Sequence, residues 1–465
     1  MQKTCDIVVI GAGPGGYAAA FYAADCGKSV VLVEQDDRLG GVCLNRGCIP
    51  SKALLHASEI LSTPDHAKEM GIHFSTPTLD LDKLRNWKNS IVQKLSNGIQ
   101  FLAKKRNITV LKGRAHFNNP QSLRVDSPSG QTTVTFEQAI IATGSRPALP
   151  ELFNLGSKRI MTSTEALDID IIPSSLLVIG GGYIGMELGT VYAELGSAIT
   201  LVEAGQSLLG GADSDLARPV IKYAKTHFKE IKLNTKIVKM ATLNNSITAT
   251  FETADNTYTE SFEKVLVSIG RLPNSENMGL ENTQVLLDDK GYIQVNTSQQ
   301  TADPSIFAIG DIAGGLLLAH KASREARVAI NTICGKTVLS NPAIPAVVFT
   351  HPEIAWVGLT EVEASQKNIS IKIASFPWVA SGRALTLGDR EKEGLTKLII
   401  DPETERILGV GIVGKGAGDL ISEGALAIEM GATAYDITQT IHPHPTLSET
   451  MMEAAEIFYG HCTHV

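Results

Sequence analysis

Residues 6–34 carry the sequence DIVVIGAGPGGYAAAFYAADCGKSVVLVE, and residues 175–203 carry SLLVIGGGYIGMELGTVYAELGSAITLVE. Each stretch is 29 residues long and predicts a short apolar strand, a tight turn, a helix and a second strand that ends in glutamate. The glycines stand at matching offsets: Gly11, Gly13, Gly16 and Gly27 in the first unit, and Gly180, Gly182, Gly185 and Gly196 in the second. This internal repeat predicts an α/β fold with two copies of one strand–helix–strand unit.

The glycine spacing in both units is typical of a dinucleotide-binding turn. The first glycine makes the turn, the second lets a pyrophosphate approach the backbone, and the third lets the helix pack on the strand. The pyrophosphate lies at the helix N-terminus, where free N–H groups favour anions. Glu34 and Glu203, which end the units, are expected to bind ribose hydroxyls. A single glycine-rich turn can belong to an ordinary α/β sheet, but two complete units predict two dinucleotide sites.

A pair of cysteines follows the first unit. Cys43 and Cys48 lie in GGVCLNRGCIPSK, residues 40–52. A bridge between such close cysteines would be short, exposed and easily reduced, unlike a structural disulfide. Two buried thiols that only pack, or a zinc site completed by a histidine, are the alternatives that the spacing leaves open. The dinucleotide unit immediately before the pair favours redox exchange between a dithiol and a cofactor.

The two sites are expected to take different cofactors. The first unit opens the chain and leads into the cysteines, so it should hold a bound flavin as FAD. The second should hold a diffusible nicotinamide. A carboxylate at Glu203 would repel the 2′-phosphate of NADP, and residues 204–217 contain no lysine or arginine to receive one. NAD is therefore the expected nicotinamide cofactor.

Length and composition exclude other classes of protein. A chain of 465 residues predicts roughly two to four domains. The net charge of −8 argues against nucleic acid as the main partner, and no apolar run is long enough to predict a membrane helix. Six cysteines are too few for a disulfide framework, so a reducing, cytoplasmic setting is expected. Cys5 and Cys26 are expected in the core, while Cys334 and Cys462 stand isolated in the sequence.

The remaining sequence predicts further strands. Residues 248–262 are strand-like, residues 265–273 predict one apolar strand that ends in Gly-Arg, and residues 301–314 predict a strand whose end presents Asp311. From about Pro342 the pattern changes to that of a separate α+β domain.

Six stretches carry a resemblance to a known family. They are GGVCLNRGCIPSKALLH (40–56), ATGSRP (142–147), IFAIGDIAG (306–314), LAHKA (318–322), FTHPEIAWVG (349–358) and HPHPTLSE (442–449). In this order they resemble the flavin disulfide reductases, and most closely the dihydrolipoamide dehydrogenase subfamily. The resemblance implies two Rossmann-like domains, for FAD and NAD, and a C-terminal α+β dimerisation domain. The implied domains are 1–147 for FAD and the cysteine pair, 148–272 for NAD, 273–341 as a central domain that completes the FAD site, and 342–465 as the interface domain.

The resemblance also implies roles around the cysteines. Cys43 would be the thiol that exchanges with the substrate, and Cys48 the thiol on the flavin side. Lys52, one helical turn after Cys48, would approach the flavin and pair with Glu187.

A histidine near the C-terminus would supply the acid and base. The resemblance implies that His444, oriented by Glu449, reaches Cys43 across a dimer interface. From the residues alone, a histidine between Pro443 and Pro445 is more often a surface-loop residue.

The cofactor contacts implied by the resemblance fall into two sets. Those for FAD are Gly11, Gly13, Gly16, Glu34, Lys52, Thr143, Gly144, Asp311 and Ala319. Those for NAD are Gly180, Gly182, Gly185, Glu203, Gly270 and Arg271. No metal is expected.

The implied function is oxidation of protein-bound dihydrolipoyl groups with NAD⁺. A homodimer would serve the lipoyl domains of a 2-oxo acid dehydrogenase complex or the lipoyl carrier of glycine cleavage, with neither nucleic acid nor membrane as a partner. One departure is Tyr183, where many members of the subfamily have an aliphatic residue and glutathione reductases use a tyrosine lid. The main alternative is an NAD(P)H-dependent reductase of another small disulfide, such as glutathione. A non-catalytic subunit is the alternative outside the enzymes, and the intact cysteine pair argues against it.

Overall fold

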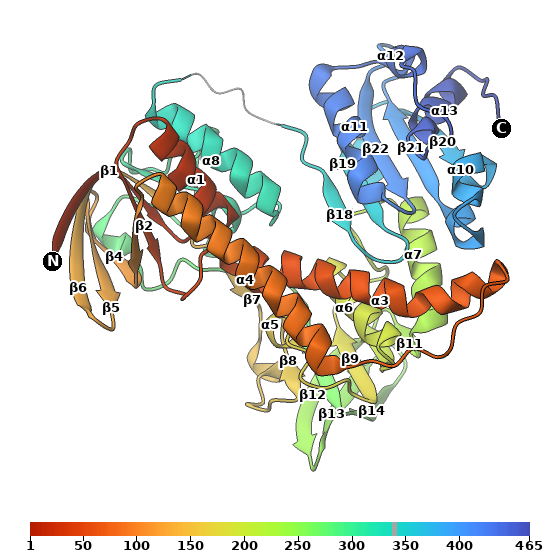
Figure 1. The fold of residues 1–465 in the computed structure, drawn as a ribbon, viewed down its shortest axis with the longest axis horizontal. Helices are drawn as coiled ribbons and strands as arrows, with labels where there is room; N and C mark the ends of the chain where they lie inside the picture. Colours follow the sequence, from red (N-terminus) through yellow and green to blue (C-terminus); the bar gives the residue numbers. More distant parts are fainter. Residues whose placement is uncertain (337–341) are drawn as a thin grey trace.

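The first repeat unit forms the middle of a seven-stranded sheet (Figure 1). The computed structural model describes residues 1–336 and 342–465. The strand order is β3-β2-β1-β6-β5-β4, with β17 paired to β6, and β1 runs parallel to both β2 and β6. The strands are β1 (Gln2–Ile10), β2 (Val30–Glu34), β3 (Thr109–Lys112), β4 (Arg114–Asn119), β5 (Ser122–Ser127), β6 (Gly130–Ile141) and β17 (Ile306–Ala308).

Both faces of this sheet are covered, which explains the apolar runs in its strands. Along β1, Ile7 and Val9 pack against helices on one face, whereas Val8 and Ile10 pack into a second cluster with β4 and β5. Because side chains alternate along a strand, a strand that is buried on both faces is apolar throughout. The covering helices are α1 (Pro14–Asp25), α4 (Leu81–Lys105) and α8 (Ala319–Ile333).

The second repeat unit forms a five-stranded parallel sheet in the order β11-β10-β9-β15-β8. Helix α6 covers one face, and the antiparallel sheet β12-β13-β14 covers the other. The elements are β8 (Ile160–Met161), β9 (Ser175–Ile179), α6 (Tyr183–Glu194), β10 (Ala198–Val202), β11 (Glu230–Lys232), β12 (Lys236–Leu243), β13 (Ser246–Glu252), β14 (Thr257–Phe262) and β15 (Lys264–Val267). The two sheets confirm the expected pair of Rossmann-like domains.

One predicted strand is wrong. Residues 265–273 were expected to form a single strand, but β15 ends at Val267 and β16 (Arg271–Pro273) pairs instead with β7 (Ser145–Pro147). Gly270, between them, has a φ of +130°, a conformation that interrupts a strand. The β7–β16 ribbon therefore connects the seven-stranded sheet to the five-stranded sheet.

The C-terminal region is a separate α+β unit, as expected. Its antiparallel sheet has the order β18-β19-β22-β21-β20, and α11 and α13 pack on it around the buried Trp378. The elements are β18 (Ala346–Val348), β19 (Ile354–Gly358), α9 (Glu361–Lys367), β20 (Lys372–Pro377), α10 (Gly382–Leu385), β21 (Leu395–Ile400), β22 (Ile407–Val413), α11 (Ala417–Met430), α12 (Ala434–Gln439) and α13 (Glu449–Phe458). The expected boundary at 341/342 falls against residues 337–341, which lie outside the described residues.

Helix α3 runs from the first repeat unit to the second (Figure 1). It begins at Cys48 beside the first glycine turn and packs against α6 of the second unit. Helix α7 then packs the second unit against β22 of the C-terminal sheet. The elements are α2 (Gly41–Arg46), α3 (Cys48–Glu69), α5 (Ser163–Ala166) and α7 (Ser214–His227).

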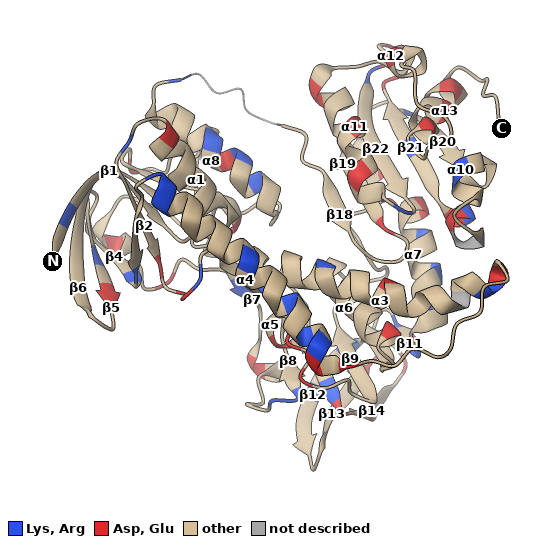
Figure 2. Cartoon of the chain, viewed as in Figure 1, with Lys and Arg blue, Asp and Glu red and all other residues tan. Residues whose placement is uncertain are grey.

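Charged residues are spread over the whole molecule. Figure 2 shows acidic and basic residues interspersed on helices and strands of all three regions. Among the helices in the described ranges, none is both long and apolar enough to cross a bilayer.

Candidate active site

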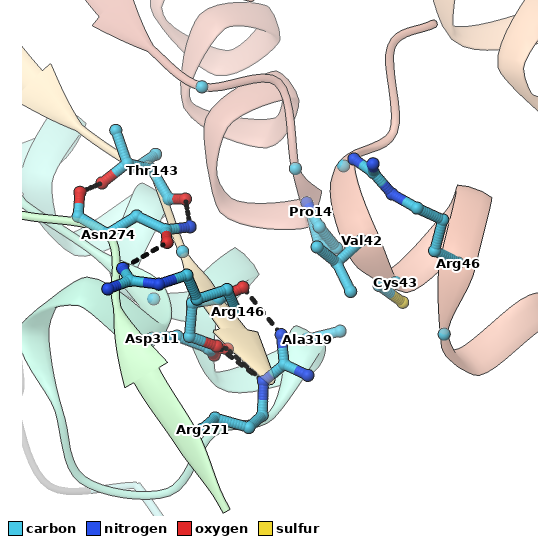
Figure 3. Close-up of a pocket in the computed structure, with 18 of the residues that line it drawn as sticks. Pro14, Val42, Cys43, Arg46, Thr143, Arg146, Arg271, Asn274, Asp311 and Ala319 are labelled. Carbon is cyan, nitrogen blue, oxygen red and sulfur yellow. Dashed lines mark hydrogen bonds and ion pairs between the residues drawn. The ribbon is translucent and has the colours of Figure 1, made fainter. Parts of the chain in front are cut away.

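A deep cavity of about 540 Å³ lies where the two repeat units, the cysteine pair and the start of α8 meet. Figure 3 shows Cys43 on one side of it and Arg271, Asp311 and Ala319 on the other. The predicted site residues that line the cavity are Gly11, Gly13, Glu34, Cys43, Cys48, Lys52, Thr143, Gly144, Glu187, Arg271, Asp311 and Ala319. The fold thus gathers most of the predicted residues in one place.

The first glycine turn has the geometry that its spacing predicts. Gly11 has a φ of +96°, and a Cβ there would lie 2.4 Å from the carbonyl oxygen of Ala142. At Gly16, a Cβ would lie 1.8 Å from the carbonyl oxygen of Gly11. Gly13 differs, because its φ of −68° is ordinary and the nearest protein atom lies 3.9 Å from the Cβ position. Packing does not require glycine at 13, which points to close approach by a ligand.

The second glycine turn repeats this geometry. Gly180 has a φ of +104°, and a Cβ at Gly185 would lie 2.0 Å from the Gly180 carbonyl oxygen. At Gly182 no protein atom lies within 4 Å of the Cβ position. The turn therefore leaves the same open approach that Gly13 leaves in the first unit.

The glutamate that ends each unit stabilises the turn. Glu34 Oε2 accepts a hydrogen bond from the N–H of Ala12 at 2.8 Å, and Glu203 Oε2 accepts one from the N–H of Gly181 at 2.7 Å. Burial raises the pKa of Glu34, although backbone N–H groups oppose the shift. Both carboxylates thus stand beside a turn, where a ribose is expected.

Three helices that begin at the glycine turns or at the cavity wall have no side-chain cap. The N-caps of α1, α6 and α8 are Gly13, Gly182 and Leu318, and none of them bonds to a first-turn N–H. Uncapped N–H groups and the helix dipole favour anions such as pyrophosphate. The residues present therefore fit two dinucleotides.

Cys43 and Cys48 lie together at the cavity wall as free thiols. A hydrogen bond from the Cys43 thiol lowers the pKa of Cys48, and Lys52 lowers it further, while burial opposes both effects. The same hydrogen bond, together with burial, raises the pKa of Cys43. The reduced pair therefore carries its negative charge on Cys48.

Lys52 and Glu187 form the contact that the resemblance implies. The Lys52 Nζ lies 2.9 and 2.8 Å from the two carboxylate oxygens of Glu187, whose exposed fraction is 3%. Ser51 Oγ donates to Glu187 at 2.9 Å, and the N–H of Phe349 donates to it at 3.0 Å. The Phe349 ring lies under Lys52, 4.4 Å from Nζ to the ring centroid. A residue of the C-terminal region thus helps to position this partly buried pair.

The segment after β6 faces the cavity opposite the cysteines (Figure 3). Thr143 Oγ1 donates to the Asn274 carbonyl oxygen at 3.0 Å, and Asn274 Nδ2 donates to the Thr143 carbonyl oxygen at 2.9 Å. Gly144 follows with a φ of +68°. This exchange of hydrogen bonds fixes the backbone that lines the cavity.

Arg271 and Asp311, expected at different cofactors, lie close together. Arg271 Nε lies 3.8 Å from Asp311 Oδ2, and Arg271 donates to the side chain and the carbonyl of Ser145, each at 2.7 Å. Ser145 Oγ in turn donates to Asp311. Gly270, with a φ of +130°, precedes Arg271 at the start of β16. These residues lie at the junction of the two expected cofactor sites.

His444 and Glu449 form a dyad away from the cavity. Glu449 bonds to His444 Nδ1 at 2.8 Å and accepts from the N–H of Thr446 at 2.7 Å. Burial alone would raise the pKa of Glu449, but these two hydrogen bonds outweigh burial and lower it. The His444 side chain is 75% exposed, and neither member of the dyad lines the cavity that holds Cys43. This geometry suits a histidine that acts on a second subunit.

Several contributing residues were not predicted from the sequence. Ser51, Ser145 and Phe349 lie inside recognised motifs, whereas Asn274 carries no local signal of its own. Asn274 meets Thr143 across 131 residues of chain, a separation that no spacing rule covers.

One of the remaining cysteines departs from expectation. Cys5 is buried, as expected, whereas Cys26, also expected in the core, is only partly buried because it ends α1 at the surface. Cys462 donates to Glu453 at 2.6 Å.

Two protein-family models cover most of the chain. Residues 5–326 match the pyridine nucleotide-disulphide oxidoreductase model, and residues 344–455 match the dimerisation domain of that family. The second match supports assembly as a homodimer.

Individual relatives agree with these models. The dihydrolipoyl dehydrogenase of Vibrio cholerae is 44% identical over 459 residues, which cover 98% of this chain and 96% of that protein. A Staphylococcus aureus dihydrolipoyl dehydrogenase is also 44% identical, with 99% and 97% covered.

Solved structures show the same architecture. LpdA of Mycobacterium tuberculosis superposes with a TM-score of 0.90 at 25% identity, with 97% of this chain and 99% of that chain covered. The flavoprotein disulfide reductase RclA of Escherichia coli, solved as a Cu(II) complex, has a TM-score of 0.87 at 27% identity, with 98% and 100% covered. With the paired glycine turns and the cysteine pair at one cavity, these matches show that the chain belongs to the pyridine nucleotide-disulphide oxidoreductase family, whose members use FAD and a nicotinamide cofactor.

Proposed function

We propose that this chain acts as a dihydrolipoyl dehydrogenase, which oxidises protein-bound dihydrolipoyl groups to lipoyl groups with NAD⁺ as the final acceptor. The observation that carries the proposal is the thiol pair, Cys43 and Cys48, at the wall of a cavity beside two dinucleotide-type turns. The 44% identity to dihydrolipoyl dehydrogenases over nearly the full chain supports this choice of substrate.

The cofactors would be held by the residues named from the sequence. FAD would contact Gly11, Gly13, Gly16, Glu34, Lys52, Thr143, Gly144, Asp311 and Ala319. NAD would contact Gly180, Gly182, Gly185, Glu203, Gly270 and Arg271. We also propose the domain limits 1–147, 148–272, 273–341 and 342–465, which the pairing of β17 with β6 and the separate C-terminal sheet support.

The thiol exchange would begin at Cys43. A substrate thiolate attacks the Cys43 sulfur of the oxidised pair, the disulfide breaks, and Cys48 leaves as a thiolate. The second substrate thiol then attacks the mixed disulfide, so that the lipoyl ring closes and Cys43 is released. The low pKa of Cys48 makes it the better leaving group, because low-pKa thiols leave faster.

The proton would pass to the partner subunit's His444. Since Nδ1 of the ring bonds to a carboxylate, Nε2 is the nitrogen free to accept a proton from the substrate thiol. Glu449 keeps the ring in that orientation and stabilises its protonated form. Because neither residue lines the cavity of its own chain, this role requires the homodimer.

The remaining electron transfer depends on the cofactors. When bound, FAD supplies the two-electron chemistry that connects the reduced cysteine pair to NAD⁺. Lys52, held by Glu187, keeps a positive charge beside Cys48. Glu203 would exclude NADP by repelling its 2′-phosphate.

The proposed setting is the cytoplasm. The partners would be lipoyl domains of 2-oxo acid dehydrogenase acyltransferases or the lipoyl carrier of glycine cleavage, because only the lipoyl arm needs to reach Cys43.

Tyr183 favours a second candidate function, the reduction of a small disulfide such as glutathione by NAD(P)H. It is the first residue of α6, lines the cavity and is 43% exposed, as a lid over the nicotinamide would be. Glu203 counts against NADPH, so we rank this candidate second.

Steady-state kinetics of the purified holoenzyme separate the two functions. We expect NADH formation from dihydrolipoamide and NAD⁺, little activity with NADP⁺, and no oxidation of NAD(P)H by oxidised glutathione. The variant Cys48→Ser should retain FAD and lose about a thousandfold or more of the lipoamide activity. Turnover of glutathione in place of lipoamide, or normal lipoamide turnover by Cys48→Ser, would contradict the proposal.

A further inference from the structure

A second pair of cysteines lies at the far ends of two helices. Cys26 is the C-cap residue of α1 and Cys334 is the C-cap residue of α8, with φ angles of −85° and −84°. Both side chains are partly exposed and pack against the same apolar cluster. The two side chains are therefore neighbours at the same end of the helix pair, and Cys334 contributes to the raised pKa of Cys26.

The two helices run side by side in the same direction, as Figure 1 shows. Near their starts, a Cβ at Gly15 would lie only 3.2 Å from the Cβ of Ala322. Further along, the Tyr22 hydroxyl donates to Asn331 Oδ1 at 2.8 Å. The difference in residue number between contacting residues is nearly the same for Gly15 and Ala322, for Tyr22 and Asn331, and for Cys26 and Cys334. Small residues at this contact let the helix axes approach closely, and the same register brings Cys26 and Cys334 together at the ends of the two helices.

We propose that Cys26 and Cys334 form a second disulfide under oxidising conditions, which braces the two helices beneath the cofactor cavity. Both helices begin at that cavity, where Gly15 of α1 and Ala319 of α8 line the wall. A covalent link at their C-terminal ends would keep the N-terminal ends of α1 and α8 in register at the cavity. It would also close a very long loop of chain, which restricts the unfolded state strongly.

The oxidant in this proposal is hydrogen peroxide. The Cys26 thiolate attacks one peroxide oxygen, the O–O bond breaks, and after proton transfer a sulfenic acid and one water are formed. The Cys334 thiol attacks that sulfur, the S–S bond forms, and a second water leaves. Two thiols and one peroxide thus yield one disulfide and two waters.

The pair should react more slowly than the cysteines at the cavity. Burial and the neighbouring Cys334 raise the pKa of Cys26, against a lowering effect of Lys336. Thiolate is the reactive form, so Cys48, whose pKa is lowered, should react first.

Peptide mapping of the peroxide-treated holoenzyme tests the proposal. The protein is treated with enough peroxide to close the Cys43–Cys48 bridge completely and to oxidise further thiols. It is then alkylated under denaturing conditions and digested. We expect the peptides of Cys26 and Cys334 to be recovered as one linked species that a reductant separates. The midpoint of thermal unfolding should rise by about 5 °C relative to a Cys334→Ser variant treated in the same way.

The matched control is Cys462→Ser, because Cys462 bonds to Glu453 rather than to a thiol. This variant should keep both the linked peptide and the raised midpoint, whereas Cys334→Ser should lose both. Recovery of Cys26 and Cys334 as separate alkylated or sulfinylated residues would overturn the disulfide. A linked peptide without a rise in the midpoint would overturn the bracing role.

Discussion

Lys52, which is paired with Glu187, adds to the effect of the Cys43 thiol in favouring the thiolate form of Cys48. In Lys52→Met, the cation that favours the Cys48 thiolate is lost, and the Glu187 carboxylate, which disfavours that thiolate, is no longer paired. Both changes raise the pKa of Cys48. Alkylation of Cys48 in the reduced enzyme at neutral pH should therefore slow by about threefold to tenfold, with its pH profile moved to higher pH.

The matched control is Lys415→Met, which removes an exposed lysine paired with Glu59 at 3.4 Å, away from the cavity. Its alkylation profile should coincide with that of the unmodified protein. A Lys52→Met profile that also coincides would show that the Cys43 hydrogen bond alone sets the charge on Cys48.

For single residues, the sequence predicted which residues carry the chemistry better than it predicted which side chains surround them. The motifs around Cys43, Cys48 and Lys52 indicated redox chemistry before any fold was known. They did not indicate that Phe349 contacts both Lys52 and Glu187, because Phe349 belongs to the C-terminal region, far along the chain. Local spacing constrains only what lies within a turn or two of helix.

The two glycine turns offer a test at the scale of the element. In Gly182→Ala the new methyl group meets no protein atom within 4 Å, so stability should not change. The methyl group would lie where the pyrophosphate of NAD approaches, and the KM for NAD⁺ should rise by about tenfold with FAD content unchanged.

The comparison variant is Gly185→Ala, whose methyl group would lie 2.0 Å from the Gly180 carbonyl oxygen. It should lower the free energy of unfolding by about 1–3 kcal/mol. Urea unfolding and NAD⁺ kinetics measure both effects. Loss of stability in Gly182→Ala without a change in KM would contradict a ligand role for that glycine.

Elements were predicted well where the apolar pattern repeats and poorly where one glycine interrupts it. The strands on either side of each turn follow from apolar runs between glycines. The break at Gly270 was missed, because its neighbours are apolar on both sides and the ribbon formed by β7 and β16 depends on a partner far along the chain.

In the molecule as a whole, Lys397 connects the second repeat unit to the C-terminal sheet. Its Nζ lies 2.8, 2.7 and 2.6 Å from carboxylates of Asp213, Asp215 and Glu361, and its side chain is 1% exposed. Burial disfavours its charge, but these bonds outweigh burial and raise the pKa of Lys397. The stabilisation is therefore fully present at neutral pH and is lost only as the pH rises through that raised value.

Lys397→Met should lower the free energy of unfolding by about 3 kcal/mol, because it leaves the buried carboxylate of Asp213 without its cation. The exposed Lys415→Met should change it by less than about 1 kcal/mol. Urea unfolding measures both. Equal effects would show that the buried cluster contributes no more than a surface pair.

The dimer can be tested by mixing two inactive variants. Cys48→Ser removes the thiol pair and His444→Gln removes the base. If each site combines the cysteines of one subunit with His444 of the partner subunit, a mixed dimer contains one intact site. Random reassembly of equal amounts should then restore about one quarter of the activity of the unmodified protein.

Recombination is checked by tagging one variant and isolating the mixed dimer. Absence of activity in that dimer would show that His444 acts on the cysteines of its own chain, contrary to the exposed position of the dyad.

The central claim is that the Cys43–Cys48 pair passes electrons from a dihydrolipoyl group towards NAD⁺. The most direct measurement mixes the oxidised holoenzyme anaerobically with one equivalent of dihydrolipoamide, counts the new protein thiols, and then adds NAD⁺. We expect two new thiols, assigned to Cys43 and Cys48 by peptide mapping, followed by one NADH per site. Unchanged thiols after dihydrolipoamide, or thiols that appear elsewhere while NADH still forms, would contradict this claim.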